Sequence, residues 1–351
     1  MKKIKNITIV GGGSAGWLTA CWLKTASSCN QKINVTIIDK SEPEIIGVGE
    51  ATLLDFPNIM RKMGFDKSDW MRRTDATFKA GGMFLDWGKK GNRIWHPFNF
   101  LNINGLSLYD LWNPSYKKEW LNFNQPEYRA SIDNKVEPNW LDVCYANNID
   151  CGKLVQVLRE WIQNEITCIF SDVVEVIWHG EDVDHLILEN EETIESDLFI
   201  DCTGFNKLLS PGGNCKDLSD RLFPNTAVAT RVPFNDNSKE MYPYVKNEAV
   251  EHGWIWTIPL RSRIGTGLVF NRDITDIEEA KKYLLNHWNH RVGEEDLKFI
   301  NWDPYVSRTF WTGNTVSIGL SAGFIEPLES TGIAMTLVGI EQLENAIVGG
   351  F

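Results

Sequence analysis

The stretch Gly11-Gly12-Gly13-Ser14-Ala15-Gly16 decides the fold of this 351-residue chain. It follows an apolar run, Ile7 to Val10, that predicts a strand, and it precedes a stretch that predicts a helix. A second predicted strand, Val35 to Ile38, ends in Asp39. Glycines between a strand and a helix, with an acid about 20 residues later, are typical of a dinucleotide site. The glycines let a pyrophosphate approach the helix N-terminus, and Asp39 would bind ribose hydroxyl groups. A purely structural glycine-rich turn is the alternative.

Three later segments extend the same sheet. Ile169 to Ile177 predicts another strand, and Asp197 to Gly204 predicts a buried strand that ends in a glycine turn. Val316 to Gly319 predicts a late strand before a helix from about Gly332. A first-strand fingerprint whose sheet is completed near the far end of the chain favours FAD over NAD, because NAD domains are more often continuous. The predicted fold class is α/β, with an FAD-binding Rossmann-like domain of glutathione-reductase type and an interleaved second β-sheet or substrate region.

This organisation predicts one interleaved flavoprotein unit over residues 1–351, because the chain has no repeats and no low-complexity linker. The FAD-binding segments are expected at about 1–80, 150–210 and 310–351, and the substrate-side segments at about 81–149 and 211–309.

Composition narrows the functional class. With 35 basic and 47 acidic residues the formal net charge is −12, which argues against nucleic acid and anionic membrane as partners. The seven cysteines are scattered without a CxxC pair, so we expect no metal site, no disulfide framework and a reducing, cytoplasmic setting. The first apolar run stops at Gly11, too short for a signal sequence, and no later stretch resembles a membrane span.

Two further segments suggest chemistry. In Trp254-Ile-Trp256-Thr-Ile-Pro259 the two indoles point to one side of a strand and form an aromatic wall, and the proline ends the ladder. An ordinary core strand is the alternative. Lys79 lies in the strand-like run TFKAGGMFLDW, where an inward-facing lysine must be neutral, paired or functional. A surface lysine on an edge strand is the alternative there.

Four segments together resemble the flavin-dependent halogenases, most closely the tryptophan-halogenase branch. They occur in family order along the chain, and they are Gly47-Val-Gly49-Glu-Ala51-Thr52, Thr77-Phe-Lys79-Ala-Gly81, the WIWTIP hexapeptide, and Ala322-Gly-Phe-Ile-Glu-Pro-Leu-Glu329-Ser-Thr331-Gly332.

The resemblance implies a role for each group of residues. Lys79 and Glu329 would be catalytic, although Glu329 alone could simply be a helix-dipole partner. Thr331 and Gly332 would bind halide at a helix start, where a plain capped helix is the alternative. Trp254, Trp256 and Pro259 would separate flavin from substrate, and His96 and Phe98 would contact the aromatic substrate. The cofactor-binding residues would be Gly11, Gly13, Ser14, Ala15, Gly16, Asp39, Gly49, Ala51, Val174 and Ile333.

The implied function is an FAD-dependent halogenase. Reduced FAD from a separate flavin reductase, oxygen and a halide ion (chloride, bromide or iodide) would give hypohalous acid. This acid would pass through an internal tunnel to Lys79 and halogenate an indole-type or phenol-type ring. A haloamine on Lys79 needs a neutral amine and therefore a lowered pKa, whereas a hydrogen-bonded hypohalous acid suits the ammonium form. Both routes stay open.

Two features of the sequence differ from related flavoproteins and bear on the alternatives to a halogenase. Gly319-Leu320 replaces the Gly-Asp of flavin hydroxylases, which disfavours an aromatic hydroxylase. The chain also ends about twenty residues after the PLESTG motif, where tryptophan halogenases continue into a helical module. An uncovered pocket would favour a homo-oligomer, or a flavin-binding protein without turnover.

Overall fold

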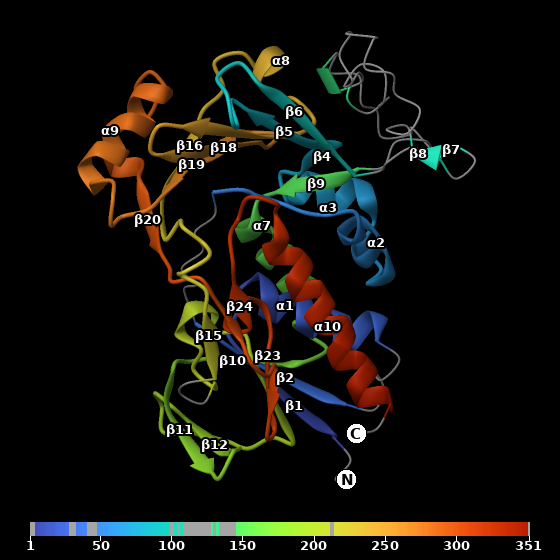
Figure 1. Ribbon diagram of the computed structural model, residues 1–351. Coiled ribbons are helices and arrows are strands. Elements are labelled where there is room, and N and C mark those ends of the chain that lie inside the picture. Colours follow the sequence, from blue (N-terminus) through green and yellow to red (C-terminus); the bar gives the residue numbers. More distant parts are fainter. Residues whose placement is uncertain are drawn as a thin grey trace.

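A six-stranded sheet and a seven-stranded sheet form the two halves of the structure, a computed structural model (Figure 1). It describes residues 4–27, 33–40, 48–98, 102–103, 106–107, 128, 131–132, 145–210 and 214–349. Gly47 of the GVGEAT segment and most of the predicted substrate-side segment between 99 and 144 lie outside these ranges. In Figure 1 the seven-stranded sheet is in the upper part, and both chain ends lie at the lower end.

The six-stranded sheet confirms the predicted fold class. Its first five strands are parallel, and only the last is antiparallel. In spatial order the strands are β10 (Thr167–Phe170), β2 (Asn34–Asp39), β1 (Asn6–Val10), β14 (Leu198–Asp201), β23 (Thr315–Ser317) and β22 (Trp311–Thr312). Parallel strands need crossover connections, so three distant parts of the chain supply them.

Helices cover one face of this sheet and a hairpin covers the other. Ile7 and Ile9 of β1 pack with Leu158, Leu337 and other helical residues in one apolar core. The Val10 side chain points to the opposite face of the sheet from Ile7 and Ile9 and packs with the hairpin. The covering helices are α1 (Ser14–Cys21), its π-helical continuation (Trp22–Ala26), α2 (Asp55–Lys62), α3 (Lys67–Arg73), α7 (Cys151–Ile162) and α10 (Thr331–Gly349). The hairpin sheet comprises β11 (Val173–His179), β12 (Asp182–Leu188) and β13 (Thr193–Ile194).

The single strand predicted from Ile169 to Ile177 is wrong. The chain leaves the parallel sheet after β10 and enters the hairpin sheet at β11. The last hydrogen bond between this part of the chain and β2 runs from the Ser171 N–H to the Asp39 carbonyl at 3.0 Å. Asp172 then accepts from the Glu189 N–H at 2.9 Å. Apolar residues lie on both sides of Ser171 and Asp172, and such a local pattern does not show that the two strands pair with different partners.

The seven-stranded sheet separates two apolar layers. On β18, Trp254 and Trp256 pack on one face, whereas Ile255 packs on the other with Leu284 of α9 (Ile277–His287). This is the alternation that a strand imposes. In spatial order the strands are β20 (Lys298–Asn301), β16 (Thr226–Val232), β19 (Ile264–Phe270), β18 (Gly253–Pro259), β17 (Val245–Val250), β5 (Gly81–Leu85) and β6 (Arg93–Pro97).

Smaller elements join the two halves. The segment Val48–Thr52, which we name the strap, contains β3 (Glu50–Ala51) and pairs with β9 (Ala146–Ile149). On its other side β9 pairs with β4 (Thr77–Lys79). The remaining pieces are the sheet of β15 (Cys215–Asp217), β21 (Tyr305–Ser307) and β24 (Gly323–Phe324), the pair β7 (Asn102–Ile103) and β8 (Leu106–Ser107), and α8 (Asn237–Glu240). Within the described ranges, no helix is both long and apolar enough to span a membrane.

The run TFKAGGMFLDW forms two strands rather than the one continuous strand that its pattern suggests. The break lies at Ala80, whose N–H donates to the Pro243 carbonyl at 2.8 Å. Lys79 therefore belongs to the small sheet with β9, and Gly81 starts a strand of the large sheet. The break places the lysine where the two halves meet.

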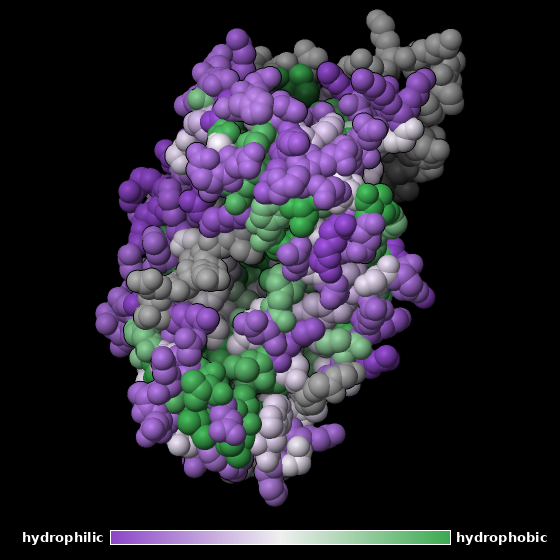
Figure 2. Space-filling model, turned by 90° about the vertical axis from the view of Figure 1, so that its left-hand side faces the viewer, coloured by the Kyte–Doolittle hydropathy of each residue, from purple (hydrophilic) through white to green (hydrophobic). Residues whose placement is uncertain are grey.

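The face on the left of Figure 1 is largely hydrophilic in its upper part (Figure 2). Hydrophobic side chains gather lower on this face, at the level of the β11–β12 hairpin. Within the hairpin itself, Val174 and Trp178 of β11 are exposed hydrophobic residues, at 60% and 38% exposure.

Two glycines at the start of α1 are expected to have different roles: Gly16 in the stability of the fold and Gly13 in ligand binding. In Gly16→Ala the new Cβ would lie 1.9 Å from the Gly11 carbonyl oxygen, so we expect the free energy of unfolding to fall by roughly 2 to 3 kcal/mol. In Gly13→Ala the new Cβ meets nothing within 4 Å, so the loss should stay below about 1 kcal/mol. Urea unfolding measures both.

FAD titration of the same two proteins completes this test. Gly13→Ala should weaken FAD binding, because its methyl group points into the open space before α1. Unfolding losses of equal size in the two variants would contradict the proposed division of roles.

Candidate functional site

Lys79 lies at the end of β4 with its amine inside the protein. The residue is only 5% exposed, and Nζ donates to the Thr52 carbonyl and to Ser330 Oγ, each at 3.1 Å. The ring centroid of Phe98 lies 5.3 Å from Nζ. The strap, the loop before α10 and the segment after β6 therefore meet at one amine.

Burial changes the proton affinity of this amine. It lowers the pKa of Lys79 from its usual value of 10.5 to about 7, although the nearby Glu329 carboxylate opposes the shift. At this pKa about half of the amines are neutral at pH 7. The amine can then act as a nucleophile under neutral conditions, which a surface lysine hardly does.

Buried polar groups fix β4 to the strand that carries the tryptophans. Thr77 Oγ1 donates to the Pro259 carbonyl at 2.6 Å, and Asn148 Nδ2 donates to Thr77 Oγ1 at 3.1 Å. Asn147 Nδ2 donates to the Thr77 carbonyl at 3.2 Å, and its backbone pairs with Thr52. Sequence reasoning missed both asparagines, whose one signal is a pair of adjacent amides shortly before α7. They hold the lysine strand, the strap and Pro259 in one arrangement.

Glu329 and His96 contact each other, which the sequence did not indicate. His96 Nδ1 lies 3.0 Å from Glu329 Oε2, and the side chains are 51% and 50% exposed. The hydrogen bond from His96 lowers the pKa of Glu329, with the charges of His96 and Lys79 adding to the effect. The same contact raises the pKa of His96. The pair lies beside Lys79, whose charge also affects both groups.

The two indoles of the WIWTIP segment form a buried wall. Trp254 and Trp256 have ring centroids 6.2 Å apart at an interplanar angle of 60°. They share one apolar cluster with Ala51 of the strap and with Leu328, next to Glu329. The wall therefore lies between the strap and the β18 backbone, on the face of the sheet away from α9.

Thr331 and Gly332 are the first two residues of α10. Ser330 precedes them in a left-handed conformation with φ +60°, which turns the chain into the helix. The first N–H groups of a helix have no acceptor inside it and carry its positive dipole end. Thr331 Oγ1 is engaged with the Glu326 carbonyl at 3.4 Å, whereas a Cβ on Gly332 would meet open space. The position thus has room for an ion.

The turn before α1 fits a dinucleotide. A Cβ on Gly12 would meet the Asp39 carboxylate and a Cβ on Gly16 the Gly11 carbonyl, whereas one on Gly13 would meet nothing within 4 Å. This bare backbone at the start of α1 is an open cradle for a phosphate group. Ser14 begins the helix, and its side chain and that of Glu50 both hydrogen-bond with the buried Cys151 thiol. That thiol ties α1 to the strap.

The other predicted cofactor-binding residues differ in position and in the polar groups that are available to a ligand. Asp39 is buried and accepts from Trp17 Nε1 at 3.1 Å, a contact that the sequence did not reveal, and burial raises the pKa of its carboxyl. Ile333 is buried in the core, so only its backbone N–H in the first turn of α10 is left for a ligand. Val174 lies on the hairpin, away from the strap residues Gly49 and Ala51.

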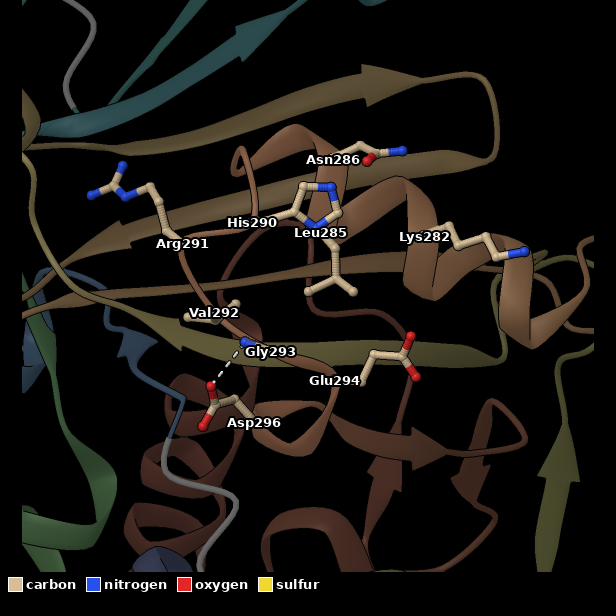
Figure 3. A pocket seen from close by; sticks show the side chains of 9 residues that line it. All are labelled: Lys282, Leu285, Asn286, His290, Arg291, Val292, Gly293, Glu294 and Asp296. Carbon is tan, nitrogen blue, oxygen red and sulfur yellow. Dashed lines mark hydrogen bonds between the residues drawn. The ribbon is translucent and has the colours of Figure 1, made fainter.

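A separate hollow borders α9 and lacks comparable chemistry (Figure 3). Arg291, one of its lining residues, pairs with Glu240 at 2.7 and 3.0 Å, and Asp296 accepts from the Gly293 N–H at 3.1 Å. It lies on the face of the large sheet opposite the tryptophan wall. In the described part of the chain, no three metal-binding side chains come together.

Comparison with known proteins gives one consistent result. A family model described as tryptophan halogenase matches residues 6–349. The chain is 32% identical to the tryptophan 6-halogenase SttH of Streptomyces toxytricini, over 98% of this chain and 72% of that protein. It is 30% identical to the tryptophan 7-halogenase RebH of Lentzea aerocolonigenes, over 97% and 69% respectively.

Solved structures agree with this result. BrvH, a flavin-dependent halogenase from Brevundimonas sp. BAL3, superimposes with a TM-score of 0.87 at 31% identity, covering 97% of this chain and 72% of that one. A tryptophan C-6 flavin-dependent halogenase from taromycin biosynthesis gives a TM-score of 0.88 at 33% identity, covering 97% and 71%.

The buried amine predicts that Lys79→Met stabilises the protein. Below the folded pKa of about 7 the native state holds a desolvated charge. Methionine removes that cost but also the hydrogen bonds to Thr52 and Ser330, so we expect a net gain of roughly 2 kcal/mol at pH 6.5.

The sign of the pH dependence follows from linkage. Between the folded pKa of about 7 and the unfolded value of about 10.4 the unfolded state binds more protons, so wild-type stability rises with pH in this window. The gain from Lys79→Met should therefore shrink as the pH rises. Urea unfolding at pH 6.5, 8 and 9.5 measures it, with the exposed Lys90→Met as the matched control. If Lys79→Met had a lower free energy of unfolding than the wild type at pH 6.5, burial of the charged amine would not destabilise the protein as proposed.

Proposed function

The chain belongs to the tryptophan halogenase family, and from this premise we propose that it is a flavin-dependent halogenase that acts on an indole-type or phenol-type ring through Lys79. The observation that carries the proposal is the buried Lys79 amine, hydrogen-bonded to Ser330 directly before the start of α10. Because the names of the relatives specify tryptophan, L-tryptophan is the first substrate to test.

The cofactor and halide would bind at the ends of two helices. FAD would lie with its pyrophosphate at Gly13 and Ser14 and its ring system near Gly49 and Ala51 of the strap. A separate flavin reductase would supply reduced FAD. Once bound here, reduced FAD supplies the chemistry that converts oxygen and halide into hypohalous acid. The first N–H groups of α10 at Thr331 and Gly332 would hold the halide. This arrangement needs no protein metal.

The wall would keep organic substrate away from the oxidising site. Trp254 and Trp256 are buried against Ala51, so they would stand between the flavin side and the outer surface. Pro259 would help fix the wall, because its carbonyl accepts from Thr77 on the lysine strand. Hypohalous acid is small, and we propose that it passes the wall through an internal tunnel to Lys79.

Lys79 would transfer the halogen as a haloamine. The neutral amine attacks the halogen of hypohalous acid, the halogen–oxygen bond breaks, and the released hydroxide takes an amine proton to form water. A ring carbon near His96 and Phe98 then attacks the halogen, and the nitrogen–halogen bonding pair returns to nitrogen, which takes up a proton from solvent and so regenerates the neutral amine. Glu329 accepts the ring proton, whose bonding pair restores aromaticity. The pKa of Lys79, lowered to about 7 by burial, favours this route over a hydrogen-bonded hypohalous acid.

A product assay tests the function directly. The protein is incubated with FAD, a flavin reductase, NADH, oxygen and bromide, first with L-tryptophan and then with a panel of indoles and phenols. We expect a monobrominated product by mass spectrometry, which Lys79→Ala abolishes while Lys90→Ala, an exposed control, retains it. An oxygenated product without bromine would indicate a hydroxylase, and bound flavin with no product would indicate a protein without turnover.

The halide site gives a second activity prediction. Gly332→Ala adds a methyl group where the chain leaves open space, so the fold should tolerate it while the KM for bromide rises about tenfold. Gly339→Ala, later in the same helix with ordinary contacts at 3.6 Å, is the matched control and should leave this KM unchanged. Steady-state kinetics over a bromide series measures both. An unchanged bromide KM in Gly332→Ala would remove this turn as the halide site.

A further inference from the structure

His96 and Glu329 are each held by the backbone at the place where they meet. His96 lies on β6 opposite Gly82 of β5, and β5 begins two residues after Lys79. Glu329 lies in the turn before α10, which the hydrogen bond from the Ser330 N–H to the Pro327 carbonyl closes at 3.1 Å. The contact of 3.0 Å between Nδ1 and Oε2 thus joins two fixed elements.

The direction of this hydrogen bond follows from the chemistry of the partners. An ionised carboxylate can only accept, so His96 Nδ1 carries the proton and donates it. A donor to the ionised form stabilises that form relative to the protonated acid. His96 therefore keeps Glu329 ionised and fixes one of its two oxygens.

The other charged groups around the pair act in different directions. The Lys79 charge lowers the pKa of Glu329 and also that of His96, whereas burial raises the pKa of Glu329. Glu326 is the second acid in this loop, and the Glu329 charge raises its pKa in addition to burial. The Phe84 ring, with its centroid 6.1 Å from that of His96, adds no charge. Because about half of the Lys79 amines are neutral at pH 7, the hydrogen bond from His96 stabilises the ionised Glu329 carboxylate more consistently than the Lys79 charge does.

We infer that His96 is a positioning residue that holds Glu329 as an ionised, oriented base for the ring proton. The inference rests on the proposed halogenase function and deepens it. In the step concerned the carbon–hydrogen bond of the halogenated ring cation breaks, its pair returns to the ring, and an oxygen–hydrogen bond forms on Glu329. His96 acts through Glu329, in addition to the contact with substrate that the family resemblance implies.

Two substitutions separate this role from substrate stacking. His96→Phe keeps a flat ring and loses the donor, whereas His96→Gln keeps an amide donor and loses the ring. The pH dependence of kcat for bromination of L-tryptophan, or of the best substrate in the panel, is measured from pH 4.5 to 8. Protonation of Lys79 already lowers kcat below about pH 7, so the acidic limb that reports Glu329 is the second break at lower pH. In His96→Phe this limb should move up by roughly one pH unit, because Glu329 becomes a weaker acid. In His96→Gln the limb should stay within about half of that shift, while the KM for the aromatic substrate rises.

A matched control comes from a second histidine and glutamate pair. His252 Nε2 lies 3.7 Å from Glu279 Oε1 at the β18 and α9 side of the large sheet, and its ring packs on Tyr283. His252→Phe should leave the acidic limb unchanged. A shift there too would show that the limb reports overall charge and would overturn the inference. The inference would also be overturned if the kcat of His96→Phe were lower than that of the wild type by the same factor at every pH.

A direct titration keeps the inference testable whether or not bromination is found. The side-chain carboxyl carbons of glutamate are labelled with carbon-13, and Glu329→Gln assigns the Glu329 signal. Its pKa should be higher in His96→Phe than in the wild type, and equal values would overturn the inference. Absence of brominated product with this shift present would instead count against the proposed function alone.

Discussion

The close crossing of the strap over β19 is the constraint on which the site depends. A Cβ on Gly265 would lie 1.6 Å from the Val48 carbonyl oxygen, so only bare backbone fits at this crossing. Arg263, two residues earlier, donates to the same carbonyl at 3.2 Å and to Asp150 at 2.6 Å. Asp150 caps α7 by accepting from the Lys153 N–H. The strap is thereby fixed both to the large sheet and to the helical half of the molecule.

From this crossing the strap sets two further positions. Ala51 packs on the tryptophan wall, and the next carbonyl, that of Thr52, accepts from Lys79. A one-residue displacement of the strap would bring a different backbone carbonyl to the amine and turn Ala51 away from the indoles, because strand side chains alternate. The proposed flavin contacts, the wall and the lysine are thus coupled by geometry, without any contact between the ligands themselves.

The sequence revealed those parts of the site that depend on residues close together in the chain. The turn from Gly11 to Gly16 and the WIWTIP strand can be read locally, because glycine and proline have fixed conformational meanings. The contacts of Asp39 with Trp17, of Glu329 with His96 and of Thr77 with Asn148 cannot. They join residues on different elements, and each is decided by the packing of sheets whose mutual placement no local pattern contains. The wrong strand from Ile169 to Ile177 has the same origin, since apolar character does not name the partner strand.

Ser330 shows how a buried amine and an anion site can exist side by side. Its hydroxyl accepts from Lys79, and its left-handed backbone starts the helix whose first N–H groups form the proposed halide site. A charged Lys79 would attract the halide toward itself, in competition with the helix end. Burial reduces this competition, because it lowers the pKa of Lys79 to about 7 and leaves the neutral amine in a large share of the molecules. The neutral amine is also the nucleophilic form, so in the proposed mechanism the desolvation that destabilises the fold would favour both halide binding at the helix end and reaction at the amine.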